Sequence, residues 1–243
     1  MLQISHLTKS YKKKAVVDDF SLTVDVPVFG FLGQNGAGKT TIMKMIVGLL
    51  KPTSGEILLD GTPSVSEASK RRIGYMPETP YFYENMTGME FLRLCDELDG
   101  SAGRGKADRT PHYEALLTRV GIYAARDAEV RTYSKGMRQR LGFAQALVND
   151  PEYLFLDEPL DGLDPIGRRE MKEVMIGLKK EGRKVFLNTH ILYDVEEVCD
   201  EVGVIHKGKL LYSGPVKAFA KGKSLEEQFM ATVEAHEHER ART

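Results

Sequence analysis

A glycine-rich segment in the first fifth of the chain carries the clearest chemistry in the sequence. Gly33-Gln-Asn-Gly-Ala-Gly-Lys39-Thr40 has a glycine, four further residues, and then glycine, lysine and threonine, which is the spacing of a phosphate-binding loop. Glycines let backbone N–H groups converge on an anion, and the N-terminus of a following helix adds a favourable dipole. Lys39 can reach the β- and γ-phosphates, and the Thr40 hydroxyl can bind Mg²⁺. We therefore predict a nucleotide phosphate site.

Two acidic residues follow an apolar run in the second half of the chain. The run Tyr153-Leu-Phe-Leu156 is typical of a buried strand, and Asp157 and Glu158 come directly after it. A carboxylate at a strand end beside a phosphate loop suits a Mg²⁺ site, so Asp157 is the candidate, acting through a water molecule. Glu158 could polarise or deprotonate a water molecule aimed at the γ-phosphate. The alternative is a pair of solvated carboxylates at an ordinary strand end.

A histidine follows another apolar run. Lys184–Thr189 predicts a buried strand, and His190 comes directly after it. If this strand lies beside the phosphate loop in the sheet, His190 can contact the γ-phosphate. The alternative is a histidine in the core or on the surface without a catalytic role.

Hydrophobic periodicity predicts the elements that position these groups. The predicted strands are 2–7, 16–24, 28–32, 56–59, 153–156, 184–189, 202–205 and 209–212. The predicted helices are 41–50 with Leu49 on its apolar face, one opened by a capping box of Thr87 and Glu90, 113–120, 135–148, one opened by Asp164-Pro165, and one containing residues 225–233. Turns are expected at Asp60-Gly61 and at Lys207-Gly208, each between two strands.

The order of these elements predicts the fold class. Strands and helices alternate before about residue 77 and again after 150, whereas helical patterns dominate between them. We therefore predict an α/β fold with a mainly parallel sheet, a β-rich N-terminal lobe and a helical subdomain inserted at about 77–150. The main domain is expected to cover 1–219, and 220–243 to form a helical, charged tail. Residues 99–106 are rich in glycine and charge and predict an exposed loop.

Composition excludes several classes of protein. The chain has 34 Lys+Arg and 35 Asp+Glu, a net charge of −1, which argues against a nucleic-acid partner held by bulk charge. The N-terminus lacks the pattern of a secretory signal, and no run approaches the roughly 18 apolar residues of a membrane helix. The two cysteines are expected to be ordinary buried thiols. We expect a cytoplasmic protein that meets a membrane only through a partner.

The motifs taken together resemble the ATP-binding cassette of ABC transporters. The resemblance rests on the phosphate loop, Tyr133-Ser-Lys-Gly-Met-Arg-Gln-Arg140, Asp157-Glu158, Gly162-Leu-Asp164-Pro and His190, in that order. It covers about Met1 to Phe219 and is similar to single-cassette subunits that pair with a separate membrane permease, particularly the antibiotic-export type. It implies a P-loop NTPase core of RecA-like topology, an antiparallel β lobe, ATP and Mg²⁺ as ligands, and ATP hydrolysis coupled to transport.

The resemblance also implies a role for each matching residue. Tyr11 would stack on adenine, where the alternative is an ordinary aromatic residue at a strand edge. Asp157 would organise Mg²⁺, Glu158 would be the catalytic base, and His190 would sense the γ-phosphate. The residues implied around the phosphates are Gly33, Asn35, Gly36, Ala37, Gly38, Lys39, Thr40 and Thr41.

A further implication is a homodimer that forms when ATP binds. Ser134 and Gly136 open a helix and would contact the γ-phosphate bound by the other subunit, and Asp164 would lie in a loop that crosses to the partner. The subunit would be cytoplasmic, on the inner face of the membrane, and held there by the permease.

Three residues depart from the family pattern. Lys135 and Met137 stand where the signature commonly has glycine and glutamine, but the serine, the second glycine and the helix N-terminus remain, so an anion can still bind. Glu78 stands where a glutamine is usual, and an ionised carboxylate accepts but cannot donate hydrogen bonds. We hypothesise that Glu78 still senses Mg-ATP.

The sequence leaves alternatives for one segment and for the function. Pro80-Tyr-Phe-Tyr83 is either core packing under the helical region or an apolar dock for the permease. One rival function is a P-loop kinase, which gives no purpose to Ser134–Arg140 or to the acidic pair. The other is a soluble ABC-type ATPase that is not coupled to transport.

Overall fold

The computed structural model describes residues 1–12, 14–98 and 108–241 and divides the chain into two compact units. Unit 1 combines Met1–Lys70 with Phe186–Thr243, and unit 2 is Arg71–Val185. The loop predicted at 99–106 lies outside the described residues, and the subdomain boundaries at 77–150 stay a prediction. None of the described helices is both long enough and apolar enough to span a lipid bilayer.

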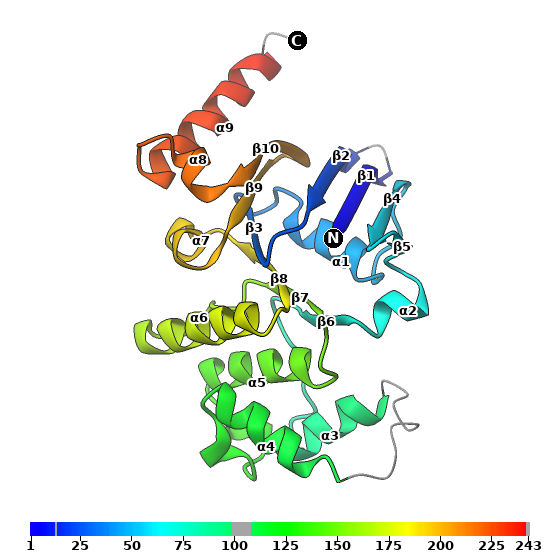
Figure 1. The fold of residues 1–243 in the computed structure, drawn as a ribbon, viewed down its shortest axis with the longest axis vertical. Helices are drawn as coiled ribbons and strands as arrows, with labels where there is room; N and C mark the ends of the chain where they lie inside the picture. Colours follow the sequence, from blue (N-terminus) through cyan, green and yellow to red (C-terminus); the bar gives the residue numbers. More distant parts are fainter. Residues whose placement is uncertain (13, 99–107, 242–243) are drawn as a thin grey trace. The chain divides into compact units, whose positions relative to one another are not determined.

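Unit 1 contains an antiparallel sheet in the strand order β2-β1-β4-β5, as predicted for an N-terminal β lobe (Figure 1). The strands are β1 (Leu2–Tyr11), β2 (Lys14–Val24), β4 (Ser54–Leu59) and β5 (Thr62–Pro63). The turn between β4 and β5 is formed by Asp60 and Gly61, with φ of +48° and +77°. Two positive φ angles are typical of the tight hairpin turn that this Asp-Gly pair predicts.

β1 and β2 each contain an extra residue that interrupts their alternation. Leu2, Ile4 and Leu7 are all buried, although the last step is one residue longer than strand periodicity allows. The register shifts between Ile4 and Leu7, where His6 has a φ of +50°. Asp19 in β2 also has a φ of +50°, and its carboxylate lies 2.8 Å from the His6 ring. These β-bulges return the apolar residues to the core face.

The other strands of unit 1 form a mixed arrangement in the order β10-β9-β3-β8. They are β3 (Val28–Leu32), β8 (Lys184–Thr189), which begins just before the unit boundary, β9 (Glu201–His206) and β10 (Lys209–Pro215). β3 pairs parallel with β9, and β9 pairs antiparallel with β10 across the predicted Lys207-Gly208 turn. All five residues of β3 are buried, as its continuous apolar run indicates.

Helix α1 (Lys39–Ile46) follows β3 and is shorter than the helix predicted at 41–50. Gly48 has a φ of +77°, which ends the helical geometry. Leu49, expected on the apolar face, is 65% exposed, so that part of the prediction is wrong. Ile42 and Ile46 are fully buried, as expected.

The C-terminal part of unit 1 is helical. It contains α7 (Leu192–Val198), α8 (Val216–Ala220) and α9 (Leu225–Ala241), and α2 (Glu67–Lys70) lies earlier in the chain. Leu225, Phe229 and Val233 of α9 are buried in a cluster with valines of β9. The helix then continues past His236 and His238 to Ala241.

Unit 2 contains the parallel strands β6 (Ile73–Met76) and β7 (Tyr153–Asp157). Its helices are α3 (Gly88–Leu98), α4 (Thr110–Arg119), α5 (Lys135–Leu147) and α6 (Pro165–Lys180), with short 3-10 turns at Tyr123–Ala125 and Val130–Thr132. The capping box is confirmed, because Thr87 and Glu90 exchange backbone-to-side-chain hydrogen bonds of 2.8 and 3.2 Å. α5 packs closely on β6, since a Cβ at Gly74 would lie 2.0 Å from the Ala146 carbonyl oxygen.

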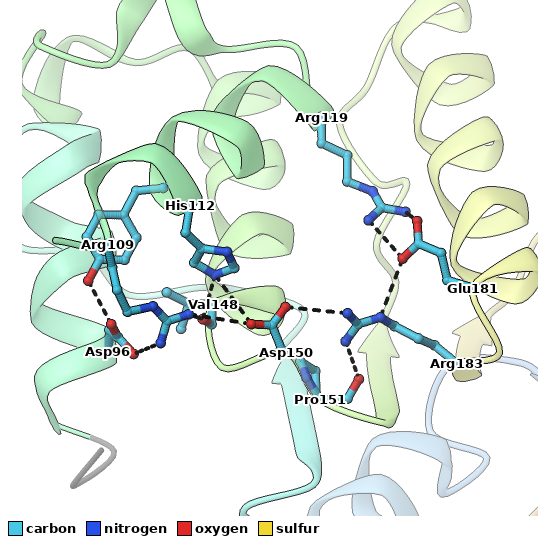
Figure 2. A network of polar contacts seen from close by, with 10 residues as sticks. Asp96, Arg109, His112, Arg119, Val148, Asp150, Pro151, Glu181 and Arg183 are labelled. Atoms are coloured by element: carbon cyan, nitrogen blue, oxygen red, sulfur yellow. Dashed lines mark hydrogen bonds and ion pairs between the residues drawn. The ribbon is translucent and has the colours of Figure 1, made fainter. Parts of the chain in front are cut away.

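A polar network joins the helices of unit 2 to the segments that follow α5 and α6 (Figure 2). Asp96 of α3 accepts hydrogen bonds from Arg109, at 2.7 Å, and from the Tyr113 hydroxyl, at 2.7 Å. Arg109 also donates to the carbonyl oxygen of Val148 at the end of α5. Asp150 lies 3.4 Å from Arg183, just after α6. The network therefore fixes the end of α5 relative to α3 and α4.

Candidate nucleotide-binding site

The phosphate loop connects β3 to α1 in unit 1. Gly36 and Gly38 have φ of +79° and +111°, in the region that favours glycine, and Gly38 is the residue that caps the N-terminus of α1. The N–H of Ile42 donates to the Gly38 carbonyl oxygen at 2.9 Å, so the helix starts directly behind the loop. Asn35 and Gly36 are exposed. Positive φ at both glycines is the geometry in which backbone N–H groups of such a loop can converge on an anion.

Lys39 lies over this loop. Its side chain is buried, with the residue 6% exposed, and its Nζ donates to the carbonyl oxygens of Gly33 at 2.6 Å and Gln34 at 3.4 Å. These are weak substitutes for phosphate oxygens, because a bond between an ammonium and an anion is stronger than one to a neutral carbonyl. Thr40 and Thr41 stand in the first turn of α1 and are partly buried.

The β9–β10 turn supports the phosphate loop from behind. The Gly208 N–H donates to the Ala37 carbonyl oxygen at 2.9 Å, and the Gly208 carbonyl oxygen accepts from the Asp18 N–H at 3.1 Å. A Cβ at Gly33 would lie 2.4 Å from the Ile205 carbonyl oxygen. Sequence reasoning missed this contact, because the two segments are far apart in the chain.

Two further predicted residues lie in unit 1. Tyr11 ends β1 and is 50% exposed, with the Lys9 ammonium 5.2 Å from its ring centroid. Its ring is therefore accessible, as stacking on a base requires. His190 directly follows β8 and is exposed. Their predicted contacts with a nucleotide stay predictions.

The acidic pair lies at the end of β7 in unit 2. Asp157 is its last residue and is 1% exposed, whereas Glu158 is partly exposed and has a φ of +50°. Burial, and then the negative charges of Asp157 and Glu78, raise the pKa of Tyr75 in the neighbouring strand above its ordinary value. Negative charge therefore gathers where β6 and β7 end, which favours a divalent cation. The carboxylate of Asp157 in unit 2 and the hydroxyl of Thr40 in unit 1 are each of a kind that Mg²⁺ accepts as a ligand.

The predicted signature opens α5. Ser134 is the N-cap residue, and its hydroxyl accepts a hydrogen bond from the Met137 N–H at 3.2 Å. Gly136 faces the segment after the acidic pair, since a Cβ there would lie 3.4 Å from Leu163 Cδ2. Lys135 pairs with Asp161 at 2.8 Å, so this departure from the family pattern has a partner of opposite charge. The N-terminus of α5 remains intact with these residues.

The same helix carries a residue that the predicted site did not include. Gln139 is 5% exposed, and its Nε2 donates to the Glu158 carbonyl oxygen at 2.9 Å. The available signal was its position in the segment Tyr133–Arg140. Asp164, the predicted crossing residue, is the exposed N-cap of α6 and accepts from the Gly167 N–H at 2.6 Å.

The aromatic residues of Pro80–Tyr83 fit both alternatives, core packing and an exposed docking surface. Phe82 packs edge-on against Phe91, with ring centroids 5.0 Å apart. Tyr81 and Tyr83 are 90% and 62% exposed. One aromatic residue therefore serves the core, and two are available to a partner.

Comparison with known proteins places this geometry in a family. The family model described as ABC transporter matches residues 17–161. An uncharacterized ABC transporter ATP-binding protein of Nostoc sp. is 47% identical over 197 residues, which cover 80% of this chain and 58% of that protein. The lantibiotic transport ATP-binding protein SrtF of Streptococcus pyogenes is 36% identical over 230 residues, covering 94% and 96% of the two chains.

A solved structure gives the same result. The ATP-binding subunit of an ABC transporter superposes with a TM-score of 0.86 at 30% identity, covering 96% of this chain and 99% of that one. The chain spans little more than half the length of the Nostoc relative. The α/β fold predicted for a P-loop NTPase, with an antiparallel β lobe, is confirmed. With the phosphate loop, the acidic pair and the signature segment each on the expected element, the chain belongs to the ABC transporter family, as one of its ATP-binding proteins.

Proposed function

We propose that this chain binds and hydrolyses ATP as the nucleotide-binding subunit of an ABC exporter. The observation that carries the proposal is the phosphate loop with Lys39 buried over it and α1 starting directly behind it. The similarity to SrtF, a lantibiotic transport ATP-binding protein that this chain matches almost from end to end, supports export.

The residues of the chain divide the chemical work. Loop N–H groups bind the phosphates, and Lys39 exchanges its contacts with Gly33 and Gln34 for phosphate oxygens. Glu158 orients a water molecule in line with the γ-phosphate and accepts its proton. Thr40 and Asp157 would hold Mg²⁺, the latter through water, and the bound cation neutralises charge on the phosphates. His190 contacts the γ-phosphate, and Tyr11 stacks on the base.

The active form is a head-to-tail homodimer that ATP stabilises. Ser134 is exposed at the N-terminus of α5, where helix N–H groups and its hydroxyl suit an anion presented by a second subunit. Gly136 allows close approach there, and Asp164 lies on the loop that crosses to the partner. Because ATP bridges the subunits and ADP does not, hydrolysis opens the dimer.

A separate transmembrane permease converts this cycle into transport. Tyr81 and Tyr83 form the exposed aromatic dock for it, next to Glu78, so that docking and Mg-ATP sensing share one segment. The subunit is therefore cytoplasmic and bound to the inner face of the membrane through the permease.

The Glu158→Gln variant tests the proposal. It should retain Mg-ATP and form a dimer detectable by light scattering, while phosphate release without any added acceptor falls by at least about a hundredfold, the effect of losing a general base. Glu173→Gln, an exposed carboxylate on α6 next to Arg169, is the matched control and should keep full activity. Near-normal turnover in Glu158→Gln would refute the assignment of the base, and dependence on a phosphate acceptor would favour the kinase alternative.

A further inference from the structure

The backbone at Glu158 is held by a side chain from the signature helix. The carbonyl oxygen of Glu158 accepts a 2.9 Å hydrogen bond from Nε2 of Gln139, which is 5% exposed. The two residues are 19 positions apart in the chain and both belong to unit 2. The same carbonyl oxygen also accepts from the Asp161 N–H at 3.1 Å, so a side chain of α5 and the backbone of the following turn hold it together.

Glu158 needs such support because of its own conformation. Its φ of +50° lies in the left-handed region, which is unfavourable for a residue with a Cβ. A residue in this region keeps its geometry only where the surroundings determine it, and such residues concentrate at functional sites. The carbonyl group that Gln139 holds is that of Glu158 itself, on the C-terminal side of its Cα. The hydrogen bond therefore fixes the direction in which the Glu158 side chain leaves the backbone.

One face of α5 makes further contacts with the same segment. Lys135 lies 2.8 Å from Asp161, and a Cβ at Gly136 would lie 3.7 Å from the Gly162 carbonyl oxygen. Lys135, Gly136 and Gln139 are spaced as neighbours on one helical face. The N-terminal turn of α5 and the segment 158–163 thus pack together along their length, with Gln139 as the buried contact.

We propose that Gln139 is a positioning residue for Glu158. Its hydrogen bond ties the backbone of this catalytic base to α5, the helix that Ser134 caps. This inference rests on the proposed role of Glu158 as the base. In an ATP-bound dimer, α5 faces the partner's nucleotide while Glu158 serves its own subunit's nucleotide. The Gln139 bond then makes the geometry of one site depend on engagement at the other.

Two substitutions separate the hydrogen bond from the volume of the side chain. Gln139→Glu keeps the shape but, when ionised, places an acceptor against the Glu158 carbonyl; when protonated, its O–H can donate in place of the amide. Gln139→Met keeps the length and cannot donate at any pH. Gln145→Glu, partly buried on the same helix, is the control for added negative charge.

The proposal predicts a loss in kcat of about tenfold or more for both variants at pH 8, because misplaced catalytic groups slow the reaction steeply. KM for ATP should change by less than about twofold, since the phosphate loop is untouched. The ratio of the kcat of Gln139→Glu to that of the unmodified protein should rise as the pH falls from 8 to 6. The same ratio for Gln139→Met should stay constant, and Gln145→Glu should keep its activity.

Two results would overturn the inference: unchanged kcat in both variants, or unchanged kcat in Gln139→Met alone, since methionine cannot donate at any pH. Melting temperatures identify any variant that fails to fold, and Gln139→Met still tests the loss of kcat if Gln139→Glu does not fold. Glu158→Gln keeps the two proposals apart. If it abolishes turnover while Gln139 variants are fully active, the base is correct and only the positioning role fails.

Discussion

The Nζ of Lys207 lies 2.6 Å from a carboxylate oxygen of Glu237, which joins the β9–β10 turn to the last helix of the chain. His206, whose side chain is 8% exposed, contacts the same carboxylate. Hydrogen bonds from Lys207 and then from His206 lower the pKa of Glu237 to about 2. The turn that α9 holds in this way is the one whose Gly208 N–H supports the phosphate loop at Ala37.

The Glu237→Gln variant should therefore be less stable than the unmodified protein at pH 7. Since the pKa of Glu237 falls from 4.5 to about 2 on folding, its ionised form stabilises the folded state above about pH 4.5. This contribution is lost as the pH falls from 4.5 toward 2, so the difference between the two proteins should shrink over that range. Urea midpoints at pH 7, 4 and 3 measure it. Glu234→Gln, exposed one turn earlier, is the control, and equal midpoints at pH 7 would contradict the anchoring role of Glu237.

Alanine substitutions at Gly208 and Gly61 separate two costs of replacing a turn glycine: backbone strain and a steric clash. Their φ angles are +79° and +77°, so alanine costs about 1 kcal/mol at either position from backbone strain alone. A Cβ at Gly208 would also lie 2.3 Å from the Val16 carbonyl oxygen, whereas nothing lies within 4 Å at Gly61. Gly208→Ala should lower the free energy of unfolding by at least about 1 kcal/mol more than Gly61→Ala. It should also raise KM for ATP, and similar losses in both variants would show that the clash is relieved.

The sequence predicts best those elements whose signal is local. The strands at 28–32 and 184–189 are confirmed to the residue, because each contains a run of buried apolar residues, Val28–Leu32 and Val185–Leu187. The N-cap at Asp164 and the capping box at Thr87 are confirmed for the same reason, since capping depends on residues three positions apart.

Features that depend on backbone handedness or on distant contacts could not be predicted. The end of α1 is set by Gly48 in a left-handed conformation, which apolar periodicity does not reveal. The bulges in β1 and β2 place His6 and Asp19 at positive φ without a glycine to announce them. In the candidate site, the types and spacing of Gly33–Thr40 predicted the phosphate loop. The hydrogen bond between Gln139 and Glu158 joins helix α5 to the residue that follows β7. These segments are 19 residues apart, and only the fold brings them together.

Cys95 should react slowly with thiol reagents although it is a free cysteine. Burial raises its pKa to about 11 from an ordinary 9.0, which lowers the reactive thiolate at pH 8 by about a hundredfold. In a Cys199→Ser background, the rate should rise steadily with pH up to about 11, and should be much faster in urea at pH 8. Cys95 and Cys199 are partly rather than fully buried, so slow reaction reflects the pKa as well as access. Equal rates at pH 8 in the folded and unfolded protein would contradict this.

The contact of Asp96 with Arg109 and Tyr113 should be the most costly polar contact to disturb among those in Figure 2. Asp96 is 5% exposed, so Asp96→Asn removes a buried charge that Arg109 needs while leaving the shape unchanged. We expect a loss of about 2 kcal/mol in the free energy of unfolding, because hydrogen bonds to charged groups are the stronger class. Tyr113→Phe removes one hydrogen bond and should cost about 1 kcal/mol.

The double variant decides whether this network acts as a unit. Asp96 is shared by Arg109 and Tyr113, so in Asp96→Asn the Tyr113 hydroxyl has already lost its charged acceptor. The loss of stability in the double variant should therefore be smaller than the sum of the losses in the two single variants. Glu97→Gln, exposed on the next position of α3, should change stability by less than about 0.5 kcal/mol and is the control for charge. Strict additivity in urea unfolding would show that the two contacts act independently. A loss in Asp96→Asn no larger than that of Glu97→Gln would mean that α3 and α4 are held by apolar packing alone. A coupled loss instead makes Asp96 the residue through which Arg109 fixes the end of α5 at Val148, and hence the helix that carries Gln139.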